Sequence, residues 1–342
     1  MKLIRQITVI FLAAALLLSF VVGCQRNGTS GELERQEQTF YAMDTFVDVI
    51  IWTAKDSQEV EEIFQEVEAE LKRLHDIFSA FEDDSDVARI SAAAGVSPVA
   101  VHAETLEVVQ TALDYAVMTD GKFDITLAPV LRLYTFGENE RVPTEQELAE
   151  KLPLVDYSLV EVDQDAGTVF LPQQGMSMDL GGIAKGYVVD IISDMLRDLG
   201  VETGVVNAGG DISFVGPKYD GTPWRIGIKD PNRHLTHHFA VIEAEGGAIV
   251  TSGNYERYVE KDGVRYHHII DPADGNPARG CKSVTIVAPN AMLADLLSTA
   301  VFVMGPEAGM ALVESLEGIE ALIWDAEDQV QASSGLVWED RR

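Results

Sequence analysis

The stretch Met178-Asp-Leu-Gly-Gly-Ile-Ala-Lys-Gly-Tyr-Val-Val-Asp190 carries more information than any other part of this chain. A short apolar run ends in Asp179, paired glycines predict a tight turn, and a helical pattern follows at once. A strand–glycine turn–helix junction directs backbone N–H groups and a helix N-terminus at one point, which suits phosphate. The pattern matches neither the Walker loop nor the Rossmann fingerprint, whose glycines and lysine are spaced differently. A turn packed for structural reasons alone is the alternative.

The composition of the 342 residues is that of a globular protein with a net charge of −31. This acidity argues against binding nucleic acid, which needs patches of Lys and Arg. It also argues against docking on anionic lipid by charge. A bound divalent cation would offset part of the local repulsion between carboxylates. The sequence contains no clear interdomain linker, so we expect one compact domain over residues 39–342.

Residues 1–23 are typical of a bacterial lipoprotein signal, with a positive start, a long apolar run and a glycine directly before Cys24. Cleavage before Cys24 and lipidation of that cysteine would anchor the chain to a membrane of the bacterial cell envelope, outside the cytoplasm. An uncleaved membrane anchor is the alternative. Residues 24–38 are polar and predict a flexible tether. Cys281 is the only other cysteine, so we expect no intramolecular disulfide.

Hydrophobic periodicity in the remainder predicts an α+β (mixed α/β) layout of mixed sheets flanked by helices. Helices are expected at 57–78, 104–119, 144–152, 183–199, 291–303 and 306–316. Strands are expected at 41–51, 158–162, 168–171, 204–206, 212–215, 224–228, 239–243, 248–251, 265–270, 283–287, 321–324 and 330–333.

Asp295 and Thr299 are four residues apart on a predicted helix, so they share one face. A carboxylate and a hydroxyl are hard oxygen ligands that suit Mg²⁺ better than zinc. Two ligands are too few for a cage made of protein alone, so such a site would recruit a substrate phosphate and water. The alternative is that Thr299 bonds its own helix while Asp295 faces solvent.

His268 stands at the end of a predicted strand that runs into a turn beginning at Asp271. This arrangement suits a general base with an orienting carboxylate, although a core histidine beside an Asp-Pro turn fits equally. Adjacent strand residues face opposite sides, so at most one of His267 and His268 points into a given site. The hydroxyl-rich segment 250–255 lines a pocket or caps a turn, and Asp124 is a candidate site acid or a cap.

Read together and in order, these segments resemble the ApbE family, the FAD:protein FMN transferases. The resemblance implies a single T-fold-like domain and a Mg²⁺-dependent reaction. FAD is cut at its pyrophosphate, FMN is attached through its phosphate to a threonine of an acceptor protein, and AMP leaves. The implied acceptors are flavoprotein subunits of membrane redox complexes. The matching segments are 43–45, 76–79, 121–129, 179–187, 207–211, 224–231, 251–255, 268–275 and 294–299.

The resemblance also assigns individual residues. It implies metal ligation by the Gly182 carbonyl, the Asp295 carboxylate and the Thr299 hydroxyl, which replaces a purely anion-binding glycine turn. We expect His268 to act as the base with Asp271 orienting it, and Lys185 to hold a phosphate. The implied FAD contacts are Met43, Phe81, Lys122, Phe123, Asp124, Asp179, Lys185, Ile270 and Ser298.

Four positions depart from the family pattern. Asp44 stands where the family usually has glycine, and Phe81 occupies a position often held by tyrosine. Asp274 stands where threonine is common, and Asn254 where aspartate is common. Two other functions would use the same residues. An FAD pyrophosphatase would release free FMN and AMP, and a flavin-binding lipoprotein would bind FAD without cleaving it.

Overall fold

The computed structural model describes residues 33–80, 82–137, 139–232 and 237–342. Cys24 and Phe81 lie outside these ranges. Strand β1 (Glu34–Ala42) starts inside the expected tether, so residues 34–38 belong to the folded domain. No helix in the described ranges is long and apolar enough to cross a membrane.

The helices agree closely with the predicted periodicity. The predicted 57–78 helix has the same bounds in the structure, because Asp56 accepts hydrogen bonds from the backbone of Gln58 and Glu59 and fixes its start. The short helices α3 and α5 were not among those predicted. The helices are α2 (Ser57–Phe78), α3 (Asp86–Ala92), α4 (Ala103–Met118), α5 (Ala128–Leu131), α6 (Glu145–Lys151), α7 (Ala184–Asp198), α8 (Ala291–Met304) and α9 (Pro306–Ser315).

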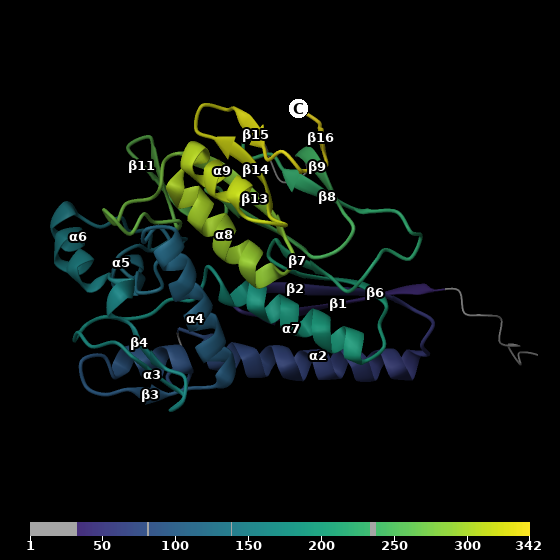
Figure 1. Ribbon diagram of the computed structural model, residues 1–342, viewed down its shortest axis with the longest axis horizontal. Coiled ribbons are helices and arrows are strands. Elements are labelled where there is room, and N and C mark those ends of the chain that lie inside the picture. Colours follow the sequence, from purple (N-terminus) through teal and green to yellow (C-terminus); the bar gives the residue numbers. More distant parts are fainter. Residues whose placement is uncertain (1–32, 81, 138, 233–236) are drawn as a thin grey trace, which may run out of the picture.

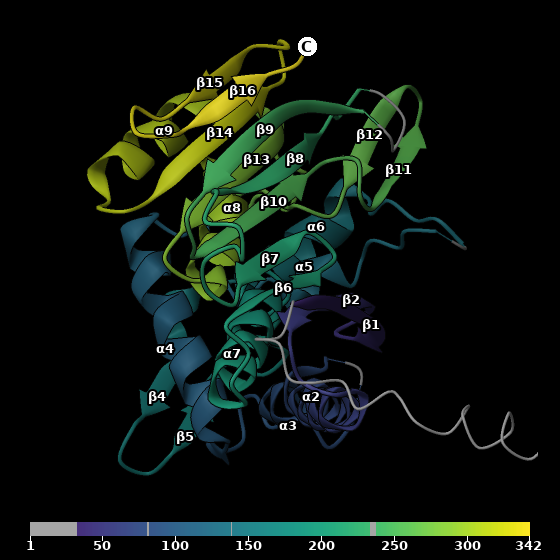
Figure 2. The same ribbon diagram turned by 90° about the vertical axis from the view of Figure 1, so that its right-hand side faces the viewer.

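One eight-stranded sheet organises the molecule (Figures 1 and 2), and its strands are arranged in chain order. Its strands after β1 are β2 (Thr45–Thr53), β6 (Thr203–Ala208), β7 (Asp211–Phe214), β10 (Ala248–Gly253), β13 (Cys281–Ala288), β14 (Glu320–Asp325) and β15 (Val330–Ala332). Neighbouring strands in this sheet are antiparallel, so α+β is the correct class and the expected mixed sheets are antiparallel instead.

Three smaller antiparallel sheets complete the fold. Strands β3, β11 and β16 were not predicted, and the expected strand at 265–270 stops at His267. The smaller sheets contain β8 (Trp224–Lys229), β9 (His238–Ala244) and β16 (Trp338–Asp340); β3 (Val99–Ala100), β4 (Glu161–Asp163) and β5 (Thr168–Phe170); and β11 (Tyr258–Lys261) with β12 (Val264–His267).

The predicted strand at 41–51 is a hairpin rather than one strand. Met43 and Asp44 form a two-residue turn between β1 and β2, and their φ angles are 52° and 56°. Positive φ at both central residues is the pattern of the turns that match the twist of a hairpin. Alternating apolar residues continue through the turn, which is why periodicity alone did not locate it.

Helices and the β8–β9–β16 sheet cover opposite faces of the large sheet. Helices α2, α7 and α8 pack on one face (Figure 1). The alternating strand residues on the other face form an aromatic core, in which Phe214 stacks on Trp224 at 5.1 Å and Phe239 meets Trp324 edge-on at 4.5 Å. This sandwich fixes the strand ends from which the site is built.

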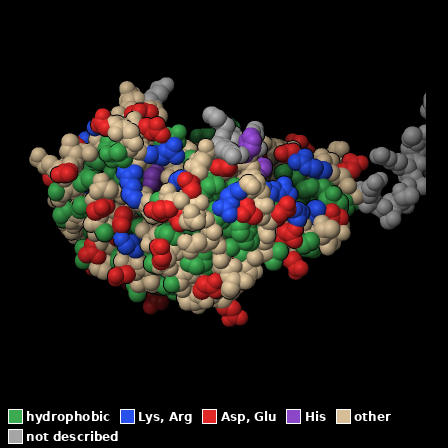
Figure 3. Space-filling view, turned by 90° about the horizontal axis from the view of Figure 1, so that it is seen from above, with side chains coloured by type: hydrophobic (Ala, Val, Ile, Leu, Met, Phe, Trp, Pro, Cys, Tyr) green, Lys and Arg blue, Asp and Glu red, His purple; other side chains and the backbone are tan. Residues whose placement is uncertain are grey.

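On the face shown in Figure 3, acidic side chains are scattered among Lys and Arg side chains rather than gathered in one field. A charged ligand is oriented by the groups inside its own binding cavity, since exposed charges are screened over about 8–10 Å in physiological salt.

Candidate active site

A cavity of about 770 Å³ lies where the 43–44 turn, the end of α2, the 179–185 segment and α8 meet. Its volume is within the range of ligand pockets. Most of the predicted site residues line it, although they come from segments far apart in the sequence. These are Met43, Lys122, Phe123, Asp124, Asp179, Gly182, Lys185, His268, Ile270, Asp295 and Thr299.

The glycine turn at 181–182 is held by its own acid. The Asp179 carboxylate accepts a hydrogen bond from the Gly181 N–H at 2.8 Å, and the Asp179 N–H donates to Ile125 at 2.8 Å. The residues before Asp179 form no strand, contrary to the expected strand–turn–helix junction. A Cβ at Gly182 would lie 3.2 Å from the Thr299 hydroxyl, so the turn and α8 are in direct contact.

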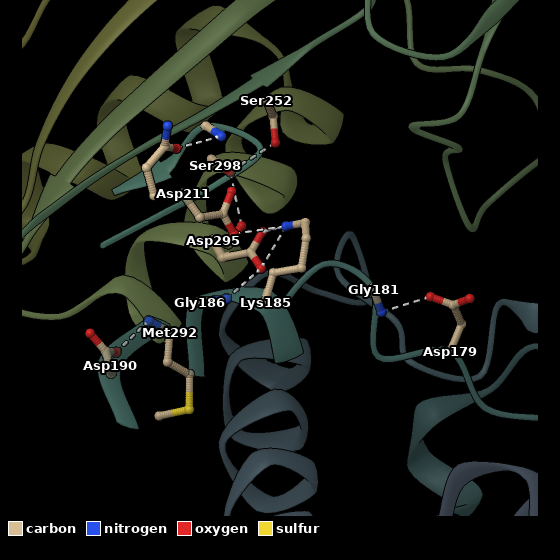
Figure 4. A network of polar contacts seen from close by, with 12 residues as sticks. Asp179, Gly181, Lys185, Gly186, Asp190, Asp211, Ser252, Met292, Asp295 and Ser298 are labelled. Carbon is tan, nitrogen blue, oxygen red and sulfur yellow. Dashed lines mark hydrogen bonds and ion pairs between the residues drawn. The ribbon is translucent and has the colours of Figure 1, made fainter. Parts of the chain in front are cut away.

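Helices α7 and α8 approach closely because Gly186 has no side chain. A Cβ there would lie only 2.2 Å from the Ala291 carbonyl oxygen. The Gly186 N–H donates to the Asp295 carboxylate at 3.2 Å, and Asp190 caps the start of α8 by accepting from Ala291 and Met292 at 2.8 Å each. These contacts fix the position of Asp295 on α8 (Figure 4).

Lys185 lies between two carboxylates. Its ammonium group is 2.8 Å from an Asp211 oxygen and 3.1 Å from both Asp295 oxygens. Both carboxylates are buried, with 3% of each residue exposed. Burial and the neighbouring Asp295 raise the pKa of Asp211. Burial alone would lower the pKa of Lys185, but the two carboxylates outweigh it and raise the pKa, so Lys185 is charged.

Asp211 was not among the predicted site residues. The sequence did contain a pattern that could have indicated it: an acid stands next to each paired-glycine turn. Asp211 directly follows the glycines at 209–210, and Asp179 comes shortly before the glycines at 181–182. Antiparallel pairing of β6 with β7 places that turn at the cavity. Lys185 was expected to hold a phosphate. In the structure its ammonium group is already ion-paired with Asp211 and Asp295.

Only one of the two adjacent histidines lines the cavity. His267 is buried, its Nε2 lies 2.8 Å from the Ala278 carbonyl oxygen, and burial lowers its pKa to about 4. His268 lines the cavity, and burial together with the Arg257 charge lowers its pKa to about 3. At neutral pH His268 is therefore a neutral imidazole that can accept a proton.

Asp271 does not orient His268 as expected. Its carboxylate is paired with Lys122 at 2.8 and 3.0 Å, and the Nδ1 of His268 lies 3.3 Å from the Arg257 carbonyl oxygen. The reason is electrostatic, because the full positive charge of Lys122 is a stronger partner for a carboxylate than a neutral imidazole. Lys122 itself lines the cavity, so Asp271 acts on the cavity through this lysine.

Asp124 both caps a turn and lines the cavity, so the two alternatives for it are compatible. Its carboxylate accepts from the Thr126 N–H at 2.7 Å, the Thr126 hydroxyl at 2.6 Å and the Tyr157 N–H at 3.1 Å. Burial raises its pKa despite these bonds.

Ser298 lies behind the cavity wall rather than on it. It is fully buried, its hydroxyl donates to the Asp295 carbonyl at 2.9 Å, and it lies 2.8 Å from the hydroxyl of Ser252, which does line the cavity. Residues that the sequence did not suggest also line the cavity, because tertiary contacts alone bring them there. Among these are Arg132, Tyr134, Phe136, Glu256 and Arg257.

Residues 43–323 match the sequence profile of the ApbE family. The chain belongs to the ApbE family. An FAD:protein FMN transferase of Treponema pallidum (strain Nichols) is 33% identical over 336 residues, which is 94% of this chain and 93% of that relative. An FAD:protein FMN transferase of Vibrio cholerae is 37% identical over 254 residues, covering 73% of this chain and 75% of the relative.

Solved ApbE structures have the same fold. The ApbE protein of Thermotoga maritima has a TM-score of 0.81 at 36% identity, covering 88% of this chain and 97% of that one. The flavin transferase ApbE from Vibrio cholerae has a TM-score of 0.78 at 32% identity, covering 89% and 98%. The predicted ApbE-like α+β domain is therefore confirmed.

Proposed function

We propose that the protein is an FAD:protein FMN transferase that attaches FMN through a phosphoester bond to a threonine of an acceptor protein and releases AMP. The observation that carries this proposal is one cavity in an ApbE-family chain that is lined by Gly182, Lys185, His268, Asp295 and Thr299. The relatives that match over most of their length are FAD:protein FMN transferases.

Mg²⁺ is the proposed metal, held by the Asp295 carboxylate, the Thr299 hydroxyl and the Gly182 carbonyl. An all-oxygen donor set suits this ion. The described residues contain no group of three or more His, Cys, Asp or Glu side chains able to hold a metal, so substrate phosphate and water would complete the coordination. The lysine ammonium between Asp211 and Asp295 supports this proposal, because a positive group already lies against these buried carboxylates. Bound Mg²⁺ would neutralise the negative charge that grows on the leaving phosphate.

The remaining cavity residues suit FAD. Met43 and Phe123 offer apolar surface for a flat ring, and Lys122 supplies a cation for phosphate. Met43, Phe123 and Lys122, together with Asp124, Asp179, Lys185 and Ile270, are our proposed FAD contacts, with Ser298 supporting them through Ser252.

His268 is the proposed base for the acceptor threonine. It lines the cavity and is neutral at physiological pH, so it can take the hydroxyl proton. Its low pKa in the free protein arises partly from burial and partly from cationic neighbours. The negative pyrophosphate of FAD would counteract those charges and raise the pKa of His268 toward the working pH.

The deciding experiment is mass spectrometry of a candidate acceptor domain after incubation with the protein, FAD and Mg²⁺. We expect a mass gain of one FMN group on a threonine, dependent on Mg²⁺. Asp295→Asn should reduce the transfer rate by about 100-fold or more, because it removes the only carboxylate in the proposed metal site. Free FMN and AMP without modified acceptor would identify a pyrophosphatase, and bound, uncleaved FAD would identify a binding protein.

We further propose that the acceptors are flavoprotein subunits of membrane redox complexes and that lipidation of Cys24 anchors the enzyme to the bacterial envelope, outside the cytoplasm. Cys24→Ser should then give a soluble enzyme with unchanged transfer activity. Membrane retention of that variant would indicate an uncleaved anchor instead.

A further inference from the structure

The Lys185 ammonium and a metal ion at Asp295 compete for the same oxygens. The Lys185 ammonium group lies 3.1 Å from both oxygens of the Asp295 carboxylate, so each oxygen already has a cationic partner. Two cations on one buried carboxylate repel each other strongly, because the surrounding dielectric is low. A divalent cation that binds Asp295 therefore has to displace Lys185 from it.

Asp211 gives the displaced lysine an alternative partner. Its carboxylate is already 2.8 Å from the same ammonium group, closer than either oxygen of Asp295 (Figure 4). Without Asp211, a metal ion at Asp295 would leave a largely buried ammonium group unpaired, and this is costly. With Asp211, the lysine shifts its pairing and remains neutralised.

The fold holds Asp211 rigidly in this place. Asp211 is the first residue of β7, directly after the 209–210 turn, and it pairs with Val250 of β10. The Asn207 side chain accepts the Gly210 N–H at 3.0 Å and braces that turn. Lys185 is longer and more flexible than this carboxylate, so the lysine is the group that moves.

We propose that Asp211 is a positioning residue that acts through Lys185, retaining its ammonium group when Asp295 takes the divalent cation. Lys185 is then a resident counter-ion of the metal-free site, and metal binding turns it from Asp295 toward the cavity. This inference rests on the metal assignment of the proposed function.

The test is a Mn²⁺ titration of the full chain without FAD, in which electron paramagnetic resonance measures free Mn²⁺. Four variants are compared with the wild type: Asp211→Asn, Lys185→Met, the double variant and Asp295→Asn. Asp325→Asn is the control, because Asp325 is a buried acid of β14 that accepts a hydrogen bond from the Gln329 N–H and does not line the cavity. Thermal unfolding verifies that each variant is folded.

We expect Asp211→Asn to weaken Mn²⁺ binding about tenfold, because Lys185 then has only Asp295 as a partner. Lys185→Met should strengthen binding. The double variant should bind Mn²⁺ like Lys185→Met, because Asp211 acts through a lysine that is no longer present. Asp325→Asn should leave the affinity unchanged.

Two outcomes would overturn the inference and leave the metal site intact. If the double variant binds as weakly as Asp211→Asn, Asp211 is itself a ligand. If Asp211→Asn binds like the wild type, Asp211 has no part in metal binding. Unchanged affinity in Asp295→Asn would instead remove the metal assignment, and the inference with it.

Discussion

Replacing Gly186 by alanine tests the contact between α7 and α8 on which the site depends. The new Cβ would lie 2.2 Å from the Ala291 carbonyl oxygen and 2.8 Å from the Met292 Cα. Both are backbone atoms, so no side-chain rotation relieves the clash. The helices would have to separate by about 1 Å to restore ordinary contact distances.

The expected cost follows from two opposing effects. Overpacking of this kind costs about 3 kcal/mol at the upper end of its usual range, which fits a clash with backbone. Alanine is a better helix former than glycine by about 1 kcal/mol. The net prediction is a loss of about 2 kcal/mol in the free energy of unfolding, and in a chain of this size that lowers the Tm by about 4 °C.

Urea and thermal unfolding of Gly186→Ala would measure this change. Gly246→Ala is the control, because a Cβ at Gly246 meets nothing within 4 Å and its φ is not in the left-handed region. The same variant should weaken Mn²⁺ binding, because separating the helices would lengthen the hydrogen bond from the backbone N–H of residue 186 to Asp295. A Gly186→Ala protein that is more stable than the wild type would refute the close helix contact, because only the helix propensity would then remain.

Asp44→Gly should raise the free energy of unfolding by about 1 kcal/mol, because Asp44 has a φ of 56° that glycine adopts without strain; a lower urea midpoint would contradict this. Burial lowers the pKa of His267 from 6.5 to about 4, so between these pH values the unfolded chain binds one proton more than the folded chain. The free energy of unfolding should therefore fall by up to about 3 kcal/mol as the pH drops through this window. His267→Asn should make the free energy of unfolding less dependent on pH. If the wild type and this variant have the same pH profile of stability, His267 is not the source. Burial and the nearby Asp325 raise the pKa of Cys281 to about 12, so in the Cys24→Ser variant the folded protein should resist iodoacetamide while the unfolded protein reacts. Rapid labelling of that folded variant would contradict the burial of Cys281.

The sequence predicted most helices and sheet strands because their apolar spacing is long and regular. The α2 residues Val60, Ile63, Val67 and Leu71 recur at helical spacing and are all buried. The elements that were missed or misread, such as β16 and the hairpin at 43–44, are short or continue the same alternation through a turn. For such elements, length and hydrophobic periodicity are not enough to predict the structure, because pairing with strands distant in the sequence decides whether a strand forms.

The site was predictable where a motif lies on one element and not where charges from several elements meet. Asp295 and Thr299 share a helix face, and both line the cavity. The pairing of Asp271 with Lys122 spans 149 residues, so no local pattern indicated it. Asp211 was missed for the same reason, since its role depends on a lysine from another element.

The order of strands in the large sheet has a consequence for how the molecule is assembled. Since each strand lies beside one that precedes it in the chain, a chain that emerges N-terminus first finds the edge for its next strand already formed. Helix α8, with Asp295 and Thr299, emerges after most of that sheet. A truncated or incompletely emerged chain therefore has most of the sheet and Lys185 but lacks the helix that carries the proposed metal ligands, so we expect the enzyme to become competent only once nearly all of its sequence is in place.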